Sequence, residues 1–139
     1  ALDGLAAELC ATRVQAGEVT AASAAEAMGA LTVGIAIAGN AKIAMLIDAD
    51  VAFHTAIHRL SGNTAIAETV AEQWPHFRRS MGLVLATTDM RVRVWAEHRD
   101  ILDAILSGDS VLAGRLARAH TAQAGQDTAR RIDRVTEVA

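Results

Sequence analysis

The chain has 139 residues, a formal net charge of −3 and 52% hydrophobic residues, which fits one domain that can bury a core of its own. Aromatic residues make up only 3% and there is a single proline, so the Ala-, Val-, Leu- and Ile-rich composition favours helices over sheets. The single cysteine, Cys10, cannot form an internal disulfide, and its apolar neighbours predict that it is buried.

Charge and hydropathy also exclude several classes of partner. No basic stretch is dense enough to follow a phosphate backbone, because Arg130 and Arg131 alternate with Asp127 and Asp133 near the C-terminus. The longest apolar run, at 30–39, is too short to cross a bilayer and contains glycine. No signal peptide is visible. We therefore expect a cytoplasmic protein without a membrane partner, and the start "ALDG" rather than Met suggests a fragment of something longer.

The first half of the chain predicts three helices. The first covers 2–14 and ends near Gly17. Thr20 is a suitable N-cap for a second helix, whose continuation at 32–39 is β-branched and has strand character, but no partner strand occurs elsewhere, so we predict helix. Asn40 is the predicted cap of a third helix over 41–60, which ends at Gly62 in the left-handed conformation.

The second half predicts three more helices. Asn63 caps the fourth, in which Pro75 predicts a kink or a local break. A turn and cap at 87–89 precede a fifth helix over 90–106, and Gly108 and Asp109 end it and cap a sixth helix that begins at 110. The predicted fold is all-α: one domain over 1–139, an antiparallel bundle of about six helices with one kinked at Pro75.

Polar residues recur on one face of the predicted third helix, in "DADVAFHTAIHRLSGN" at 48–63. Positions four apart differ by about 40° around a helix axis, so Asp50 and His54 project side by side. His58 continues the row with a larger rotation, and Asp48 points elsewhere. An Asp-x-x-x-His pair can supply two ligands to a metal ion, but such acid–base pairs are also common helix stabilisers.

His98 and His120 lie on the apolar faces of the fifth and sixth predicted helices. A buried imidazole needs a polar partner. If both helices pack against the third, a metal shared with Asp50 and His54 would satisfy all four residues. A single histidine is nevertheless more often a hydrogen-bonded residue than a ligand, so spacing alone leaves the metal site undecided.

Three sequence blocks, taken together and in order, resemble a known family. "DADVAFHTAIHRLSGN", "EHRDILDAILSGD" and "LARAH" are similar to the FCD domain, the effector-binding C-terminal domain of the FadR subfamily of GntR-type bacterial transcriptional regulators. The resemblance covers about 2–122. It implies that Asp50, His54, His98 and His120 are metal ligands and that His58 has a structural role.

The resemblance also implies a function: an effector-sensing domain that binds a divalent metal and a small organic acid. Three imidazoles and one carboxylate suit Zn, Ni, Mn or Fe, with Zn the first candidate. Trp74, Arg78 and Arg79 are candidate effector-binding residues. The family's winged helix-turn-helix DNA-binding domain is not part of this sequence, so this chain should not bind an operator alone, and a homodimer is implied.

Two other classes of function remain open from the sequence. One is a mononuclear metal-dependent enzyme, a hydrolase or oxygenase, on a helical bundle. A hydrolase needs a general base beside the metal, and Glu97 should miss the site because adjacent helical residues point about 100° apart. The other is an interaction bundle without metal, which gives no reason for the three blocks.

Overall fold

The computed structural model describes residues 1–136 and folds them into six helices without a strand in that range. The helices are α1 (Leu2–Gln15), α2 (Ala21–Ile37), α3 (Ile43–Leu60), α4 (Thr64–Val84), α5 (Thr88–Leu106) and α6 (Ser110–Thr136). The predicted all-α bundle is confirmed, and the β-branched segment 32–37 is helical, as predicted.

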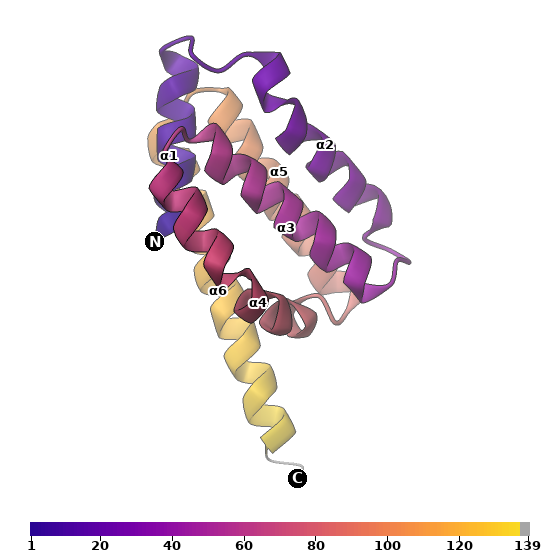
Figure 1. Cartoon of the computed structure of the whole chain (residues 1–139). Coiled ribbons are helices and arrows are strands. Elements are labelled where there is room, and N and C mark those ends of the chain that lie inside the picture. The colour runs from indigo at the N-terminus through magenta and orange to yellow at the C-terminus, as the bar shows by residue number, and fades with distance from the viewer. Residues whose placement is uncertain (137–139) are drawn as a thin grey trace.

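Side chains of α3, α5 and α6 meet inside the bundle, where Oδ1 of Asp50 lies 3.6 Å from Nε2 of His98, which in turn lies 3.2 Å from Nε2 of His120. α1 packs against α6, α3 and α5, while α2 lies along α3 and also contacts α5. α4 contacts α3 and α6, and the C-terminal turns of α6 extend beyond the rest of the bundle (Figure 1). Residues of α3, α5 and α6 that face inward therefore meet in one place.

Local side-chain chemistry fixes where most helices begin. The predicted N-cap side chains accept hydrogen bonds from backbone amides of the first turn, as at Asn63, whose Oδ1 lies 3.1 Å from the amide of Ala65. The confirmed caps are Thr20, Asn63, Thr87 and Asp109. Gly62 and Gly108 have φ of 73° and 76°, the left-handed conformation predicted for them at the ends of α3 and α5.

The prediction for the start of α3 is wrong. Asn40 does not cap the helix; the N-cap is Lys42, whose side chain makes no capping hydrogen bond. The backbone continues to turn after α2, where the amide of Ala41 donates to the carbonyl of Ile37 at 3.2 Å. This extra turn moves the N-cap of α3 two residues past the expected one, from Asn40 to Lys42.

Pro75 lies inside α4 without ending it. The helix runs without interruption through the proline, so the alternative of a local break is wrong, and its second half takes a different direction from its first half (Figure 1). A change of direction is the expected consequence of a ring that clashes with the preceding turn and removes one backbone donor.

The core is built mostly from alanine and aliphatic side chains, with Phe53 and Trp95 as its largest members. Gly34 makes room for Trp95: a β-carbon at Gly34 would lie 2.1 Å from the Trp95 ring. Cys10 is fully buried, as predicted, and its Sγ donates to the carbonyl of Ile57 at 3.2 Å. Burial raises the pKa of the Cys10 thiol to about 12, more than the charge of Arg13 lowers it.

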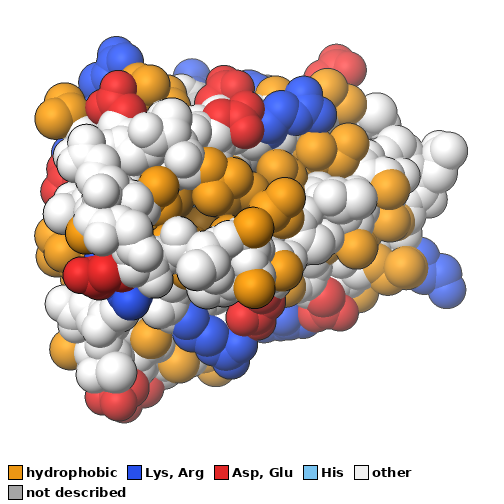
Figure 2. All heavy atoms as spheres, turned by 90° about the horizontal axis from the view of Figure 1, so that it is seen from above, with side chains coloured by type: hydrophobic (Ala, Val, Ile, Leu, Met, Phe, Trp, Pro, Cys, Tyr) orange, Lys and Arg blue, Asp and Glu red, His pale blue; other side chains and the backbone are white. Residues whose placement is uncertain are grey.

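The surface carries hydrophobic, acidic and basic side chains side by side. Seen from above, hydrophobic side chains group in the middle of the face with acidic and basic side chains around them (Figure 2). Within the described part of the chain, no helix combines the length and the hydrophobicity that crossing a bilayer requires.

The contact between α2 and Trp95 generates a stability prediction. Gly34→Ala should lower the free energy of unfolding in urea by about 1–3 kcal/mol, because the added methyl overlaps the Trp95 ring. Gly29→Ala on the same helix is the matched control, since nothing lies within 4 Å of its new methyl. The control should gain up to about 1 kcal/mol from helix propensity. Equal gains in both variants would contradict the close packing.

Candidate metal centre

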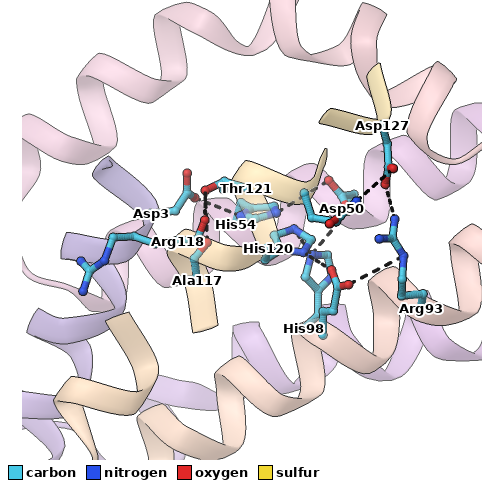
Figure 3. Close-up of polar contacts among 12 residues, drawn as sticks. Asp3, Asp50, His54, Arg93, His98, Ala117, Arg118, His120, Thr121 and Asp127 are labelled. Atoms are coloured by element: carbon cyan, nitrogen blue, oxygen red, sulfur yellow. Dashed lines mark hydrogen bonds and ion pairs between the residues drawn. The ribbon is translucent and has the colours of Figure 1, made fainter. Parts of the chain in front are cut away.

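The four residues predicted as metal ligands lie together in the centre of the bundle (Figure 3). Nε2 of His98 lies 3.2 Å from Nε2 of His120 and 3.6 Å from Oδ1 of Asp50. Nε2 of His54 lies 3.8 Å from Oδ2 of Asp50. All four are buried, with at most 9% of any of them exposed. One carboxylate and three imidazoles from three helices thus face a common point.

Asp3, on α1, orients the histidines of α3 and was not predicted from the sequence. Its Oδ1 accepts hydrogen bonds from Nδ1 of His54 at 3.1 Å and Nε2 of His58 at 2.9 Å. Because a carboxylate can only accept, His54 carries its proton on Nδ1, and its Nε2 is free to face Asp50. The sequence contains no signal for this role, because Asp3 is a lone acid in the first turn of a distant helix.

His58 lies away from the four-residue cluster. It is 1% exposed, and its recorded side-chain hydrogen bond is the one to Asp3. Asp3, His54 and His58 form a second group whose ligand-type atoms lie within 4.8 Å of one another. The hydrogen bonds from both rings to one carboxylate oxygen account for this grouping without an ion.

Glu97 supports His120 from the side opposite the cluster. Its Oε2 accepts from Nδ1 of His120 at 2.7 Å, and its Oε1 lies 3.7 Å from Nε of Arg93, which also pairs with Asp127 (Figure 3). Glu97 therefore does not face the common point of the cluster, but it contacts one of the histidines that do. It does point away from His98, its neighbour on α5, but α6 passes on that side, so Glu97 fixes the His120 ring with Nε2 toward the cluster.

Aromatic packing holds His98 in place. Its ring stacks on Phe53 with centroids 4.3 Å apart and meets Trp95 edge-on at 4.8 Å. Burial lowers the pKa of His98 well below its ordinary value, and the neighbouring His120 and His54 lower it further. His98 is therefore a neutral imidazole, the form that binds a metal.

The charge balance of the cluster favours a cation. Burial raises the pKa of Asp50, and the charges of His54 and His120 only partly oppose this. Burial alone would lower the pKa of His54, but its hydrogen bond to Asp3 and the charges of Asp3 and Asp50 raise it to about 9. Among the described residues, Asp50 has only the long contacts to His54 and His98. A buried carboxylate this poorly paired fits a site for a metal ion.

A cavity of about 430 Å³ opens beside the cluster. Asp50, His54 and His120 lie at its polar end, and Trp74, one of the candidate effector-binding residues, forms part of its wall. Arg78 and Arg79 do not line it: Arg78 pairs with Asp48, and Arg79 contacts Nδ1 of His76 at 2.8 Å. Neither arginine therefore faces the cavity in this arrangement, and their expected contact with an effector stays a prediction.

Known proteins resemble this chain in sequence. A family model described as the FCD domain matches residues 1–123. A protein of Streptomyces ambofaciens, named an uncharacterized HTH-type transcriptional regulator in an unstable DNA locus, is 38% identical over 71 residues. The match covers 51% of this chain and 30% of that relative, so it spans less than a third of the relative's length. Since the family match extends over most of its length, this chain belongs to the FCD domain family.

Proposed function

We propose that this chain is the effector-sensing domain of a transcriptional regulator and that it binds a divalent metal ion and a small carboxylate. The observation that carries the proposal is the meeting of Asp50, His54, His98 and His120, from three helices, at one buried point. Membership of the FCD family and the likeness to a protein named as an HTH-type regulator support the regulatory role.

The donor set suits a borderline divalent metal. Three imidazole nitrogens and one carboxylate oxygen, with no thiolate among them, fit Zn, Ni, Mn or Fe, and Zn is the first candidate. The metal would supply positive charge beside Asp50 and open positions for a ligand. The chain's own residues prepare this site, because Asp3 and Glu97 hold the rings of His54 and His120 with Nε2 inward.

The effector would bind in the cavity that adjoins the cluster, with its carboxylate at the end formed by Asp50, His54 and His120. A ligand there would touch α3, α4 and α6, and it can change the arrangement of these helices only if it binds two arrangements with different affinity. The readout would be altered DNA binding by a separate domain. A homodimer is also part of the proposal, and sedimentation velocity measures it directly.

The family and its named relative point to a regulatory protein rather than an enzyme. The carboxylates near the cluster also have structural partners: Asp3 accepts from two histidines, and Glu97 lies between His120 and Arg93. Neither is thereby placed to serve as a free general base.

Purified without chelator, the chain should contain about one divalent metal ion per molecule. Elemental analysis by mass spectrometry measures this, and chelation followed by titration with Zn, Ni and Mn gives the affinity of each. A metal-free preparation that binds none of the three would refute the metal centre.

His98 and His58 are similarly buried, but only His98 belongs to the predicted set of metal ligands, so substituting each of them tests that assignment. His98→Ala should abolish metal binding, whereas His58→Ala should change the affinity less than tenfold, because His58 contacts Asp3 rather than the cluster. Asp50→Asn, which keeps the side-chain shape, should also abolish binding. Calorimetric titration measures all three, with circular dichroism as the check on folding, and loss of binding in His58→Ala alone would reverse the assignment.

Glu97 should act through His120. Glu97→Gln should weaken metal binding about tenfold, because the ring loses its anionic partner while the ligands stay in place. Glu26→Gln is the control, since Glu26 pairs with Arg59 at an exposed position on α2. An unchanged affinity in Glu97→Gln would show that the hydrogen bond to His120 does not tune the metal.

A further inference from the structure

The cavity beside the cluster has two chemically different parts. Its volume of about 430 Å³ is in the range of small-molecule sites. Its polar end is formed by Asp3, Asp50, His54 and His120, and its remaining wall comes from α4, α5 and α6, together with Ala1 and Leu85. The chemistry of that wall decides what kind of body a carboxylate ligand can carry.

Hydrophobic side chains dominate the wall. Those from α4 are Val70, Trp74, Phe77, Met81 and Val84, and Val94 of α5 faces them. Val84 and Val94 are buried. Phe77 is 44% exposed, which is unusual for a large hydrophobic side chain. The kinked α4 thus carries a row of apolar side chains that face the cavity.

The hydroxyl groups on the wall are already used within their own helices. Ser80 donates to the carbonyl of Phe77 at 2.9 Å, and Thr128 donates to the carbonyl of Ala124 at 3.0 Å. Thr121 has carbonyls of its own helix at 3.2 Å. A polar ligand group on this wall would lose its hydration without gaining a free hydroxyl donor.

No Lys or Arg side chain is among the described residues that line the cavity. Arg78 and Arg79 of α4 contact Asp48 and His76, and Arg93 of α5 pairs with Asp127 and Glu97. A second carboxylate on the ligand would therefore have no basic side chain to meet within the cavity. Among the described side chains that line the cavity, none brings a positive charge to the wall away from the metal end.

We infer that the cavity selects a monocarboxylate with an uncharged, largely apolar body, such as a medium-chain aliphatic or aryl-alkyl carboxylic acid. Its carboxylate lies at the end formed by Asp50, His54 and His120, and its body lies against Trp74, Met81 and Val94. The position of the ligand's carboxylate rests on the proposed metal centre, and the position of its apolar body rests on the apolar wall. Dicarboxylates, tricarboxylates and sugar acids are disfavoured, because their further polar groups would face this wall.

Calorimetry and thermal shift on the metal-loaded 139-residue chain test the inference with butanoate, hexanoate, octanoate, phenylacetate, succinate, citrate and gluconate. Affinity should rise about fourfold per methylene from butanoate until the cavity is filled. Succinate, citrate and gluconate should bind at least tenfold more weakly than octanoate. Tighter binding of any of these three than of octanoate overturns the inference.

Variants of the wall locate the effect. Met81→Ser should weaken octanoate binding at least tenfold and leave metal affinity unchanged, whereas Met28→Ser, at an exposed position on α2, should change neither. Ser80→Arg adds a cation to the wall and should raise the affinity for succinate relative to hexanoate. Equal octanoate affinity in Met81→Ser and Met28→Ser overturns the placement of the body.

The same measurements separate this inference from the proposed function. If the chain binds metal but prefers succinate, citrate or gluconate, the apolar specificity is wrong and the metal centre stands. Alternatively, the chain binds no metal but still binds octanoate, with an affinity that rises with chain length and falls in Met81→Ser. In that case the metal centre is wrong and the apolar specificity stands. If octanoate does not bind to either form, the inference is overturned.

Discussion

The arrangement of the helices depends on the burial of one carboxylate, Asp50, together with three imidazoles, because each of these groups needs a polar partner inside the bundle. Asp50 is 5% exposed in a core otherwise made of aliphatic and aromatic side chains, and a buried charge must be paired or bound to a metal. Asp50, His98 and His120 come from three helices, so pairing them fixes the mutual positions of α3, α5 and α6. Asp3 of α1 and Glu97 of α5 pair with the histidines of the cluster in turn, so α1 is also held in place by these contacts. The polar cluster thereby links four of the six described helices.

The same cluster explains the two-sided character of the neighbouring cavity. On one side, charged groups converge and outer carboxylates set the orientation of the rings. On the other, α4 supplies apolar side chains from both sides of Pro75, and residues of α6 line the same cavity. The arginines of α4 do not line the cavity: Arg78 pairs with Asp48 of α3, and Arg79 contacts His76. The helix therefore presents hydrocarbon to the cavity and keeps its arginines outside it.

Local interactions explain which expectations from the sequence succeeded. Asn63 and Asp109 cap helices because their oxygens reach amides two or three residues ahead, and Gly62 ends α3 because it adopts a positive φ. Asn40 had the same chemistry but failed, since the preceding helix continued to turn past it. Arg78 and Arg79 were expected near the effector from their distance to Trp74, which could not show that Arg78 would meet Asp48 of α3.

The sequence by itself determined the helical class, most helix ends and, through three blocks that resemble the FCD domain, the expectation that Asp50, His54, His98 and His120 act together. These features follow from short-range periodicity and from motif order, which a single chain displays directly. Only the tertiary structure decided that Asp3 orients His54 and that Glu97 orients His120. Asp3 lies 51 residues from His54, and Glu97 lies 23 residues from His120. Contacts at such separations depend on how whole helices pack, and no local pattern specifies that packing.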